Sequence, residues 1–214
     1  MTFLITAGPT REPIDPVRYL TNRSSGKMGY ALAEAAQARG HRVILISGPT
    51  QIDVPDGVDF LPAETADEMF RAVERWITRA EVAVFSAAVA DYTIATPAAQ
   101  KIKKCGETLT LELVKTRDIL GSARESFAFD GTLVGFAAET EDLEANARKK
   151  LVDKDCDLVV ANNVSLPGVG FDSNENLVEL VYPDHTHQLP QGEKKHLAIH
   201  IIEAIEDLHL AKKL

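Results

Sequence analysis

The segment Ser24-Ser25-Gly26-Lys27-Met28-Gly29 has the residue types of an anion-binding loop. Apolar residues recur at helical spacing after it until Gly40, so Ser25 is expected to cap a helix. Free N–H groups and the dipole at a helix start attract phosphate, and Gly26 would let a ligand approach the backbone. Phosphate binding is therefore one interpretation, and the other is that Gly29 only permits close helix–strand packing.

Two familiar nucleotide fingerprints do not fit this segment. A Walker A loop needs glycine where Thr21 stands, and Ser or Thr where Met28 stands. The dinucleotide pattern GxGxxG has Ser24 in place of its first glycine, and the next expected strand ends at Ser47 without an acid to hold a ribose. A nicotinamide-dependent reductase is weakened but stays an alternative, as does a non-catalytic nucleotide-binding or scaffold domain.

Further polar candidates follow expected buried strands. The loop 8–18 carries charges and prolines directly after the first strand, where a parallel sheet lines its binding crevice. Asp91, after the small residues Ala87 and Ala88, could accept hydrogen bonds from an exocyclic amine of a flat ligand. Each has a plainer alternative, since Asn22 beyond that loop is typical of a turn and Asp91 of an exposed carboxylate.

Two groups of lysines complete the candidates. In strand geometry, Lys101 and Lys103 of the run Lys101-Ile102-Lys103-Lys104 would share one face. Lys150 and Lys154 are four residues apart on an expected helix and also share a face. A solvated edge is the alternative for the first run.

The elements that must position these residues indicate an α/β fold. Short apolar runs without alternation are separated by amphipathic helices, which is typical of a doubly wound, Rossmann-like, mostly parallel sheet. We expect strands at 3–7, 43–47, 58–61, 82–88, 133–138 and 158–161, and helices at 25–40, 65–77, 143–153 and 194–210. Period-two alternation at 109–114, 177–182 and 187–189 predicts half-exposed antiparallel strands, a small β excursion. The 214 residues fit a single domain over 1–214.

Composition narrows the function classes. A net charge of −9 argues against a broad nucleic-acid surface, although a few lysines can dominate a local cleft. We find neither a signal peptide nor an apolar run that would span a bilayer, so we expect a cytoplasmic protein with no membrane partner. Cys105 and Cys156 are expected to be reduced thiols, because two cysteines make neither a disulfide framework nor a zinc site.

Taken together, these segments resemble the phosphopantothenoylcysteine synthetase family, the synthetase half of the bacterial bifunctional coenzyme A enzyme. The matching runs occur in family order over nearly the whole chain: 6–10 with Glu12, 15–18, Asn22 with 24–29, 87–92, 101–104, 135–140, and 161–162 before 170–171. Any one run would be weak, whereas the set is specific.

The resemblance implies a ligase of coenzyme A biosynthesis with a two-step reaction. The carboxylate of 4′-phosphopantothenate attacks the α-phosphate of CTP to give an acyl cytidylate and pyrophosphate, and the amine of cysteine then displaces CMP. Triphosphate chemistry implies Mg²⁺, although no dedicated metal cluster is visible. The family also implies a homodimer and a flavin-dependent decarboxylase domain that is either fused or missing; a free-standing form is equally compatible.

The resemblance carries roles onto particular residues. Asn22 and Lys101 match catalytic positions, with Asn22 assigned to the acyl-cytidylate step. Arg18, Asn22 and Asn162 are candidates for binding phosphopantothenate. The positions that match CTP contacts are Gly8, Ser24, Ser25, Gly26, Lys27, Ala87, Ala88, Asp91, Lys101, Asp118, Ile119, Leu120, Phe136, Lys150 and Lys154.

Two places depart from the family pattern. Arg117 stands where the family has Pro, so the loop before Asp118 is expected to differ. The segment after Lys104 is short, and in the family this region forms a flap that closes over the active site of a partner subunit. The reach of that flap is therefore in question.

Overall fold

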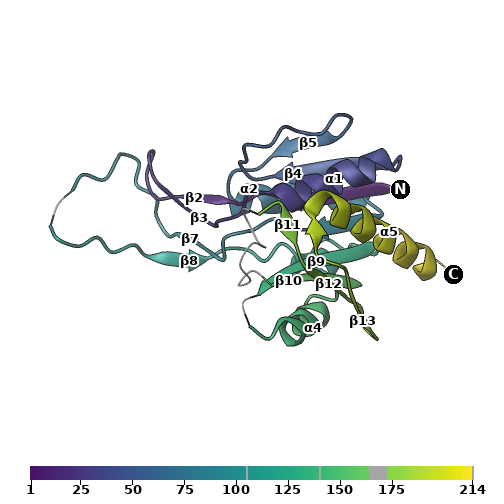
Figure 1. The fold of residues 1–214 in the computed structure, drawn as a ribbon. Coiled ribbons are helices and arrows are strands. Elements are labelled where there is room, and N and C mark those ends of the chain that lie inside the picture. The colour runs from purple at the N-terminus through teal and green to yellow at the C-terminus, as the bar shows by residue number, and fades with distance from the viewer. Residues whose placement is uncertain (105, 140, 164–172, 214) are drawn as a thin grey trace.

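The computed structural model describes residues 1–104, 106–139, 141–163 and 173–213, and its main element within these residues is an eight-stranded sheet (Figure 1). The strand order is β13-β12-β10-β9-β6-β1-β4-β5. Six strands are parallel: β1 (Thr2–Ala7), β4 (Arg42–Ser47), β5 (Asp59–Pro62), β6 (Val82–Phe85), β9 (Thr132–Glu139) and β10 (Leu158–Asn163). β12 (Val178–Val181) and β13 (Thr186–Gln188) add antiparallel strands at one edge. The predicted mostly parallel α/β sheet is confirmed.

The sheet changes direction of growth between β1 and β6. From β1 the chain adds β4 and β5 on one side, then returns to add β6, β9 and β10 on the other. Such a switch point opens a crevice beyond the carboxyl ends of the two central strands, because the connections leave it in opposite directions. Both chain termini lie at the other end of the sheet (Figure 1).

Helices cover both faces of the sheet. α1 (Lys27–Ala38) and α5 (Lys194–Lys212) pack on one face, and α2 (Ala66–Trp76), α3 (Ser122–Glu125) and α4 (Leu143–Asp153) lie on the other. Successive residues of β1 therefore enter different cores: Phe3 and Ile5 face α1, and Leu4 faces α2. Because both faces are buried, the strand shows no apolar–polar alternation in the sequence.

Three sequence predictions about elements need correction. The strand expected at 82–88 ends at Phe85, and the following residues form a loop. The strand expected at 109–114 is only β8 (Leu113–Lys115), paired with β7 (Tyr92–Ile94). The antiparallel pairing at 177–182 is confirmed, but β12 is buried rather than half-exposed because it extends the main sheet.

Small two-stranded sheets stand apart from the main one. β2 (Arg11–Pro13) pairs with β3 (Tyr19–Thr21), and β11 (Glu175–Asn176) pairs with β14 (Gly192–Glu193). The β7–β8 pair forms the base of an arm that extends away from the main sheet, opposite the termini (Figure 1). The run Lys101–Lys104 lies on this arm without strand structure, so the predicted shared face of Lys101 and Lys103 is wrong.

The loop 8–18 is fastened to α2. Buried Glu12 accepts a hydrogen bond of 2.9 Å from the backbone N–H of Ala66, at the start of this helix. Thr65 and Glu68 form a capping box there, which contributes about 1 kcal/mol. The helix start thus satisfies a buried carboxylate and holds the loop in place.

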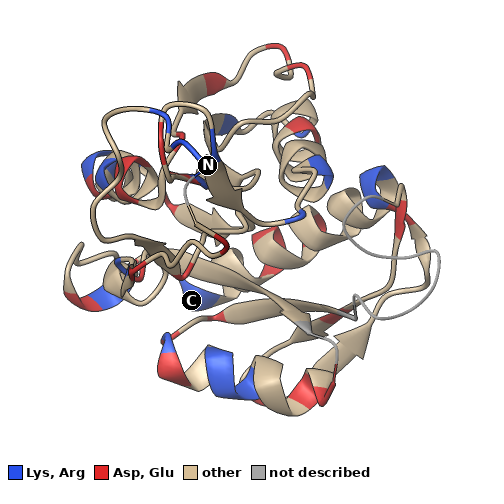
Figure 2. Ribbon diagram, turned by 90° about the vertical axis from the view of Figure 1, so that its left-hand side faces the viewer, with Lys and Arg blue, Asp and Glu red and all other residues tan. Residues whose placement is uncertain are grey.

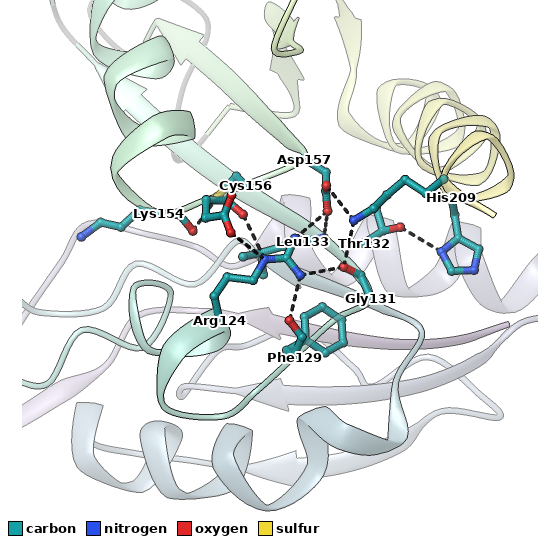
Figure 3. Close-up of polar contacts among 11 residues, drawn as sticks. Arg124, Phe129, Gly131, Thr132, Leu133, Lys154, Cys156, Asp157 and His209 are labelled. Carbon is teal, nitrogen blue, oxygen red and sulfur yellow. Dashed lines mark hydrogen bonds and ion pairs between the residues drawn. The ribbon is translucent and has the colours of Figure 1, made fainter. Parts of the chain in front are cut away.

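Arg124 lies at the amino ends of β9 and β10 (Figure 3). Its guanidinium donates to the carbonyls of Phe129 and Gly131, at 2.8 and 2.9 Å, and to the Asp157 carboxylate at 2.8 Å. Asp157 also accepts from the backbone of Leu133 and from Lys212 on α5. Arg124 and Asp157 together therefore join α3, the starts of β9 and β10, and α5.

Among the described residues, no helix is both long and apolar enough to cross a membrane.

Candidate functional site

The site begins where the loops after β1 and β6 run side by side. Ala88 donates its N–H to the Gly8 carbonyl at 2.9 Å, and Thr10 donates to the Ala88 carbonyl at 3.3 Å. Gly8 has a φ of +70°, and a Cβ there would lie 2.8 Å from the Gly48 carbonyl oxygen. Glycine is required at this position by backbone conformation and space. Gly8 thus shapes the loop and does not line the two cavities described next.

The start of α1 opens on one of these cavities. Gly26, not the predicted Ser25, is the N-cap; its φ of +79° suits glycine, and no side chain caps the helix. Ser24 accepts a hydrogen bond of 3.3 Å from the Gly26 N–H through its hydroxyl. A Cβ on Gly29 would come within 2.5 Å of the Ala7 Cβ, which supports the close-packing interpretation for that glycine. The helix start is therefore packed tightly on β1 and faces the cavity with its first turn.

We call this space the α1 cavity; its volume is about 370 Å³. It lies between the start of α1, the loop after β6, the ends of β9 and β10, and the start of α5. Its lining residues are Asn22, Arg23, Ser24, Ser25, Gly26, Lys27, Met28, Gly29, Ser86, Ala87, Ala88, Val89, Phe136, Ala138, Lys150, Asn162, Asn176 and Lys194. Predicted nucleotide-binding and substrate-binding residues from distant segments thus meet here.

A second space, the α4 cavity, has a volume of about 500 Å³. It is formed by the ends of β1 and β6, the segment 115–120 and the last turn of α4. Its lining residues are Thr6, Phe85, Ala87, Val89, Asp91, Tyr92, Lys115, Thr116, Arg117, Asp118, Ile119, Leu120, Phe136, Lys150 and Lys154. The predicted shared face of Lys150 and Lys154 is confirmed, since both line this cavity.

The two cavities share a wall made of Ala87, Val89, Phe136 and Lys150. Lys150 donates a hydrogen bond of 2.9 Å from Nζ to the Phe136 carbonyl, which fixes the ammonium at that wall. A ligand reaching from one cavity into the other would pass this cation. The arrangement suits two molecules that react where the cavities meet.

Asp118 and Lys154 form an ion pair in the α4 cavity. Burial raises the pKa of the Asp118 carboxyl, but hydrogen bonds from Lys154 and from the Gly121 N–H outweigh this and leave the pKa below its usual value. The carboxylate therefore stays charged at neutral pH. Lys154 in turn is held within the cavity.

The α1 cavity is positive in an acidic chain. Its described lining includes the cations Arg23, Lys27, Lys150 and Lys194 and no carboxylate, whereas the whole chain has a net charge of −9. Elsewhere, acidic and basic residues are interspersed along helices and loops (Figure 2). The cations of the cavity are thus a local excess, which favours an anionic ligand.

Asn22 lies over the loop after β6. Its side-chain amide donates to the carbonyls of Ala88 and Val89 at 3.0 and 3.2 Å. These bonds use both amide hydrogens, so donation to an acyl oxygen would require one of them to break. The side-chain carbonyl oxygen is the atom that can accept a hydrogen bond from a ligand.

Besides Gly8, two predicted residues lie outside both cavities. Lys101 is exposed on the arm, and Arg18 lies in the turn between β2 and β3. Arg18 forms an ion pair with the buried carboxylate of Asp15 and donates to the Ile102 carbonyl at 3.0 Å. Arg18 therefore contacts Ile102, the residue next to Lys101. Neither Arg18 nor Lys101 lines a cavity of this chain.

Sequence reasoning missed several lining residues. Lys194, the first residue of α5, is 6% exposed, and Asn176 is also buried. A lysine at a helix start carries no sequence signal of burial, because only the fold of β11 and β14 encloses it. Arg117, noted as a departure from the family, places its guanidinium 3.6 Å over the Phe70 ring and pairs with Asp67.

Whether the site could hold a magnesium ion depends on the side chains that could be its ligands. In the part of the chain that the structure describes, no group of three or more His, Cys, Asp or Glu residues could hold an ion. The α4 cavity does contain the carboxylates of Asp91 and Asp118. Magnesium is commonly held by one or two carboxylates together with substrate phosphates and water. The residues fit a magnesium ion that arrives with a triphosphate.

A larger cavity of about 870 Å³ lies beside these two, between α1, the loop after β4 and the start of α5. It shares Lys27 and Lys194 with the α1 cavity, but Glu34, Asp53 and Asp56 also line it. Its charges are mixed, and Lys27 is the one predicted site residue in its described lining. Size alone does not make it the candidate site.

Comparisons with known proteins agree with this geometry. The family model described as DFP, DNA/pantothenate metabolism flavoprotein C-terminal domain, matches residues 1–208. A Vibrio cholerae relative, described as coenzyme A biosynthesis bifunctional protein CoaBC, is 47% identical over 206 residues, 95% of this chain and 52% of the relative. A CoaBC relative from Bacillus subtilis is 48% identical over 207 residues, 96% of this chain and 51% of the relative. The chain therefore spans about half the length of the curated relatives it matches.

Among solved structures, the C-terminal domain of CoaBC matches with a TM-score of 0.82 and 40% sequence identity. The match covers 97% of this chain and 94% of that one. The similarity thus extends over the sheet, both cavities and the arm.

Proposed function

The chain belongs to the DNA/pantothenate metabolism flavoprotein C-terminal domain family, to which phosphopantothenoylcysteine synthetases belong, and we propose that it is a CTP-dependent phosphopantothenate–cysteine ligase of coenzyme A biosynthesis. It joins 4′-phosphopantothenate to L-cysteine through an acyl cytidylate. The observation that carries the proposal is a pair of adjoining cavities with Lys150 at their shared wall, one of them lined by cations and asparagines.

We assign the cytidine of CTP to the α4 cavity. Asp91 there offers a carboxylate that can accept hydrogen bonds from the exocyclic amine of cytosine. Ile119, Leu120 and Phe136 supply apolar surface for the base. The phosphates then extend past Lys150 and Lys154 toward the first turn of α1, whose N–H groups favour anions.

We assign 4′-phosphopantothenate to the α1 cavity. Asn22 and Asn162 can hydrogen-bond the amide and hydroxyl groups of its chain, and Lys194 adds a cation for its phosphate. Its carboxylate would then meet the α-phosphate at the shared wall. The protein's contribution is to hold two anions together, although they repel each other in solution.

The first step forms a bond between the carboxylate oxygen and the α-phosphorus. The bond from the α-phosphorus to the oxygen that bridges to the β-phosphate breaks, and pyrophosphate leaves. The nucleophile belongs to the substrate, so the protein needs only to align the groups and offset the charge that builds on the phosphoryl oxygens. Lys150 is positioned at the wall for this task, and Lys101 would join it when the arm meets a triphosphate.

The second step forms the amide. The cysteine amine attacks the acyl carbon, the carbon–oxygen bond to CMP breaks, and the nitrogen loses a proton. We assign Asn22 to this step: its carbonyl oxygen can accept a hydrogen bond from the amine while its amide hydrogens hold the loop. Asn22→Asp keeps an acceptor but removes the donors that hold it at Ala88 and Val89, which misplaces it, so the acyl cytidylate should accumulate, as mass spectrometry of quenched reactions would detect.

Magnesium, when bound with the triphosphate, would offset phosphate charge. Of the two carboxylates in the α4 cavity, Asp118 would hold it if Asp91 receives the base. The lowered pKa of Asp118 keeps that group charged for the purpose.

The arm supports a homodimer. Exposed apolar side chains gather on β2–β3 and β7–β8 and next to them: Val17, Tyr19, Tyr92, Leu109, Leu113 and Val114. A second copy of the chain would cover this surface. The length of the relatives further supports a fused decarboxylase domain in the natural protein.

Pyrophosphate release tests the function. Release should require both CTP and 4′-phosphopantothenate, and cysteine should then convert the intermediate to the amide with release of CMP. Calorimetric titrations with CTP, ATP and NADPH separate the alternatives. Absence of pyrophosphate with either nucleotide, together with binding of NADPH, would refute the ligase in favour of a reductase.

A further inference from the structure

The backbone of Ile102 is held on both sides by a pair of residues from the turn between β2 and β3. Its N–H donates to the Asp15 carboxylate at 3.1 Å, and its carbonyl accepts from the Arg18 guanidinium at 3.0 Å. Ile102 lies directly between Lys101 and Lys103, whose side chains are exposed. The contact therefore fastens the lysine run at its centre.

The pair is itself rigidly built. One oxygen of Asp15 accepts the N–H groups of Val17 and Arg18, both at 2.9 Å, which closes the turn. The other oxygen accepts from Arg18 Nε at 3.0 Å, from Arg18 Nη2, and from Ile102. The carboxylate is fully buried. A buried carboxylate with this many donors, one of them charged, holds its partners strongly.

The surrounding arm offers little else to fix the lysines. The described residues 95–104 have no regular secondary structure. One other backbone bond ties them to the turn, from the Ala98 N–H to the Ile14 carbonyl at 2.9 Å. Without the contact at Ile102, the chain around Lys101 would sample many positions, and its cation would be placed only at an entropic cost.

We propose that Asp15 and Arg18 are positioning residues that hold the arm at Ile102, so that Lys101 is presented to the triphosphate in one place. The inference rests on the proposed ligase function and assigns Arg18 to the arm instead of to phosphopantothenate. It holds whether the arm serves the cavities of its own chain or those of a second copy, because the contact between the turn and the arm lies within one chain.

Asp15→Asn tests the contact selectively. The amide keeps one carbonyl oxygen to close the turn, but its nitrogen now places donor hydrogens against the donors of Ile102 and Arg18. The turn can therefore form while the arm is released. Asp59→Asn is the matched control, since Asp59 pairs with Arg42 in an exposed Asp–Arg contact far along the sheet.

The first measurement does not depend on activity. Limited trypsin digestion, mapped by mass spectrometry, reports cleavage after Lys101, Lys103 and Lys104. We expect Asp15→Asn to speed this cleavage about tenfold or more, since local opening exposes the segment, and Asp59→Asn to leave it unchanged. Equal cleavage rates in wild type and Asp15→Asn would overturn the proposed contact.

The second measurement is pyrophosphate release with CTP and 4′-phosphopantothenate. Misplacing a catalytic group by about 1 Å can cost about a hundredfold, so we expect kcat to fall between about tenfold and a hundredfold in Asp15→Asn. The KM for 4′-phosphopantothenate should change little because the contact lies outside both cavities. The Tm should fall because a buried ion pair is lost, whereas general structural damage would raise this KM as well. An unchanged kcat would overturn the positioning role.

A double-mutant cycle with Arg18→Gln completes the test. If both residues act through Ile102, the double variant is no slower than the slower single variant. Additive losses with a raised KM for 4′-phosphopantothenate would instead make Arg18 a substrate ligand and overturn the proposal. If wild type releases no pyrophosphate, the ligase function fails while the trypsin result still decides whether the contact holds the arm.

Discussion

Lys150→Met removes the cation at the wall between the two cavities while keeping an unbranched apolar side chain of similar length. The wild-type ammonium is held by the Phe136 carbonyl at 2.9 Å and lines both cavities. We expect the variant to fold and to lose most of its rate of pyrophosphate release. The reason is that, in the proposed reaction, negative charge on the α-phosphoryl group grows next to this ammonium.

The magnitude follows from charge and distance. A unit charge about 4 Å from a phosphoryl oxygen contributes about 4 kcal/mol at an effective dielectric constant of about 20. Lys154 lines the same α4 cavity and would retain part of that field. A loss of about 3 kcal/mol in transition-state stabilisation remains, which is a fall in kcat of roughly a hundredfold. The lost hydrogen bond to Phe136 should cost about 1 kcal/mol of folding stability, or about 2–4 °C in Tm.

Lys149→Met is the matched control, one residue earlier on α4. Lys149 is 74% exposed and forms an ion pair with Asp153. Such a pair contributes about 0.3–0.5 kcal/mol to stability, and no effect on kcat is expected. The assay is steady-state pyrophosphate release with a thermal melt of each variant. Equal kcat values for Lys150→Met and wild type would refute the role of the shared wall, and equal losses in both lysine variants would refute its specificity.

Three further predictions test other parts of the molecule. The hydrogen bond from Arg39, aided by one from His41, lowers the pKa of the Glu206 carboxyl to about 2 despite burial. Glu206→Gln should therefore reduce the free energy of unfolding at neutral pH. In denaturation curves, the difference from wild type should vanish as the pH falls from about 4.5 to 2. Burial raises the pKa of the Cys156 thiol to about 12, so it should resist alkylation by iodoacetamide at pH 8 until the chain is unfolded, as mass spectrometry would show. Leu113→Glu on β8 should convert a dimer to a monomer in sedimentation experiments, and a variant that stays dimeric would place the interface elsewhere.

The sheet could be predicted from the sequence because its strands are buried on both faces. Continuous apolar runs such as Phe3–Ala7 and Val82–Phe85 leave few alternatives to a parallel sheet. The overlong prediction at 82–88 has a physical cause: the small apolar residues Ala87 and Ala88 continue the run but form the loop that lines both cavities. Apolar composition does not separate a strand from an apolar ligand-facing loop.

The site was predicted less completely, for two reasons. Asp91 was found because the fold class places segments that follow strand ends in the crevice, whereas Asn22 and Asp118 were assigned from the family resemblance. Lys194 and Asn176 were missed because their enclosure depends on β11 pairing with β14 from 16 or more residues away, a contact with no local signal. The residue type of Lys101 did not indicate that this residue lies outside the cavities. Only its position on the arm shows this.

A chain with a negative net charge can bind an anion only where nearby positive charges outweigh the effect of the net charge. The net charge of −9 is spread over the whole surface, and at about 0.1 M salt a charge more than about 10 Å from a ligand is largely screened. The lysines of the α1 cavity act at much shorter range and in partial shelter from water, so their attraction survives. Asp118 is paired with Lys154, and the buried carboxylate of Asp15 is paired with Arg18. Neither carboxylate lines the α1 cavity, so the positive charge of that cavity is not cancelled. Raising the salt concentration should consequently weaken exposed ion pairs such as Arg42–Asp59 sooner than it weakens anion binding at the shared wall.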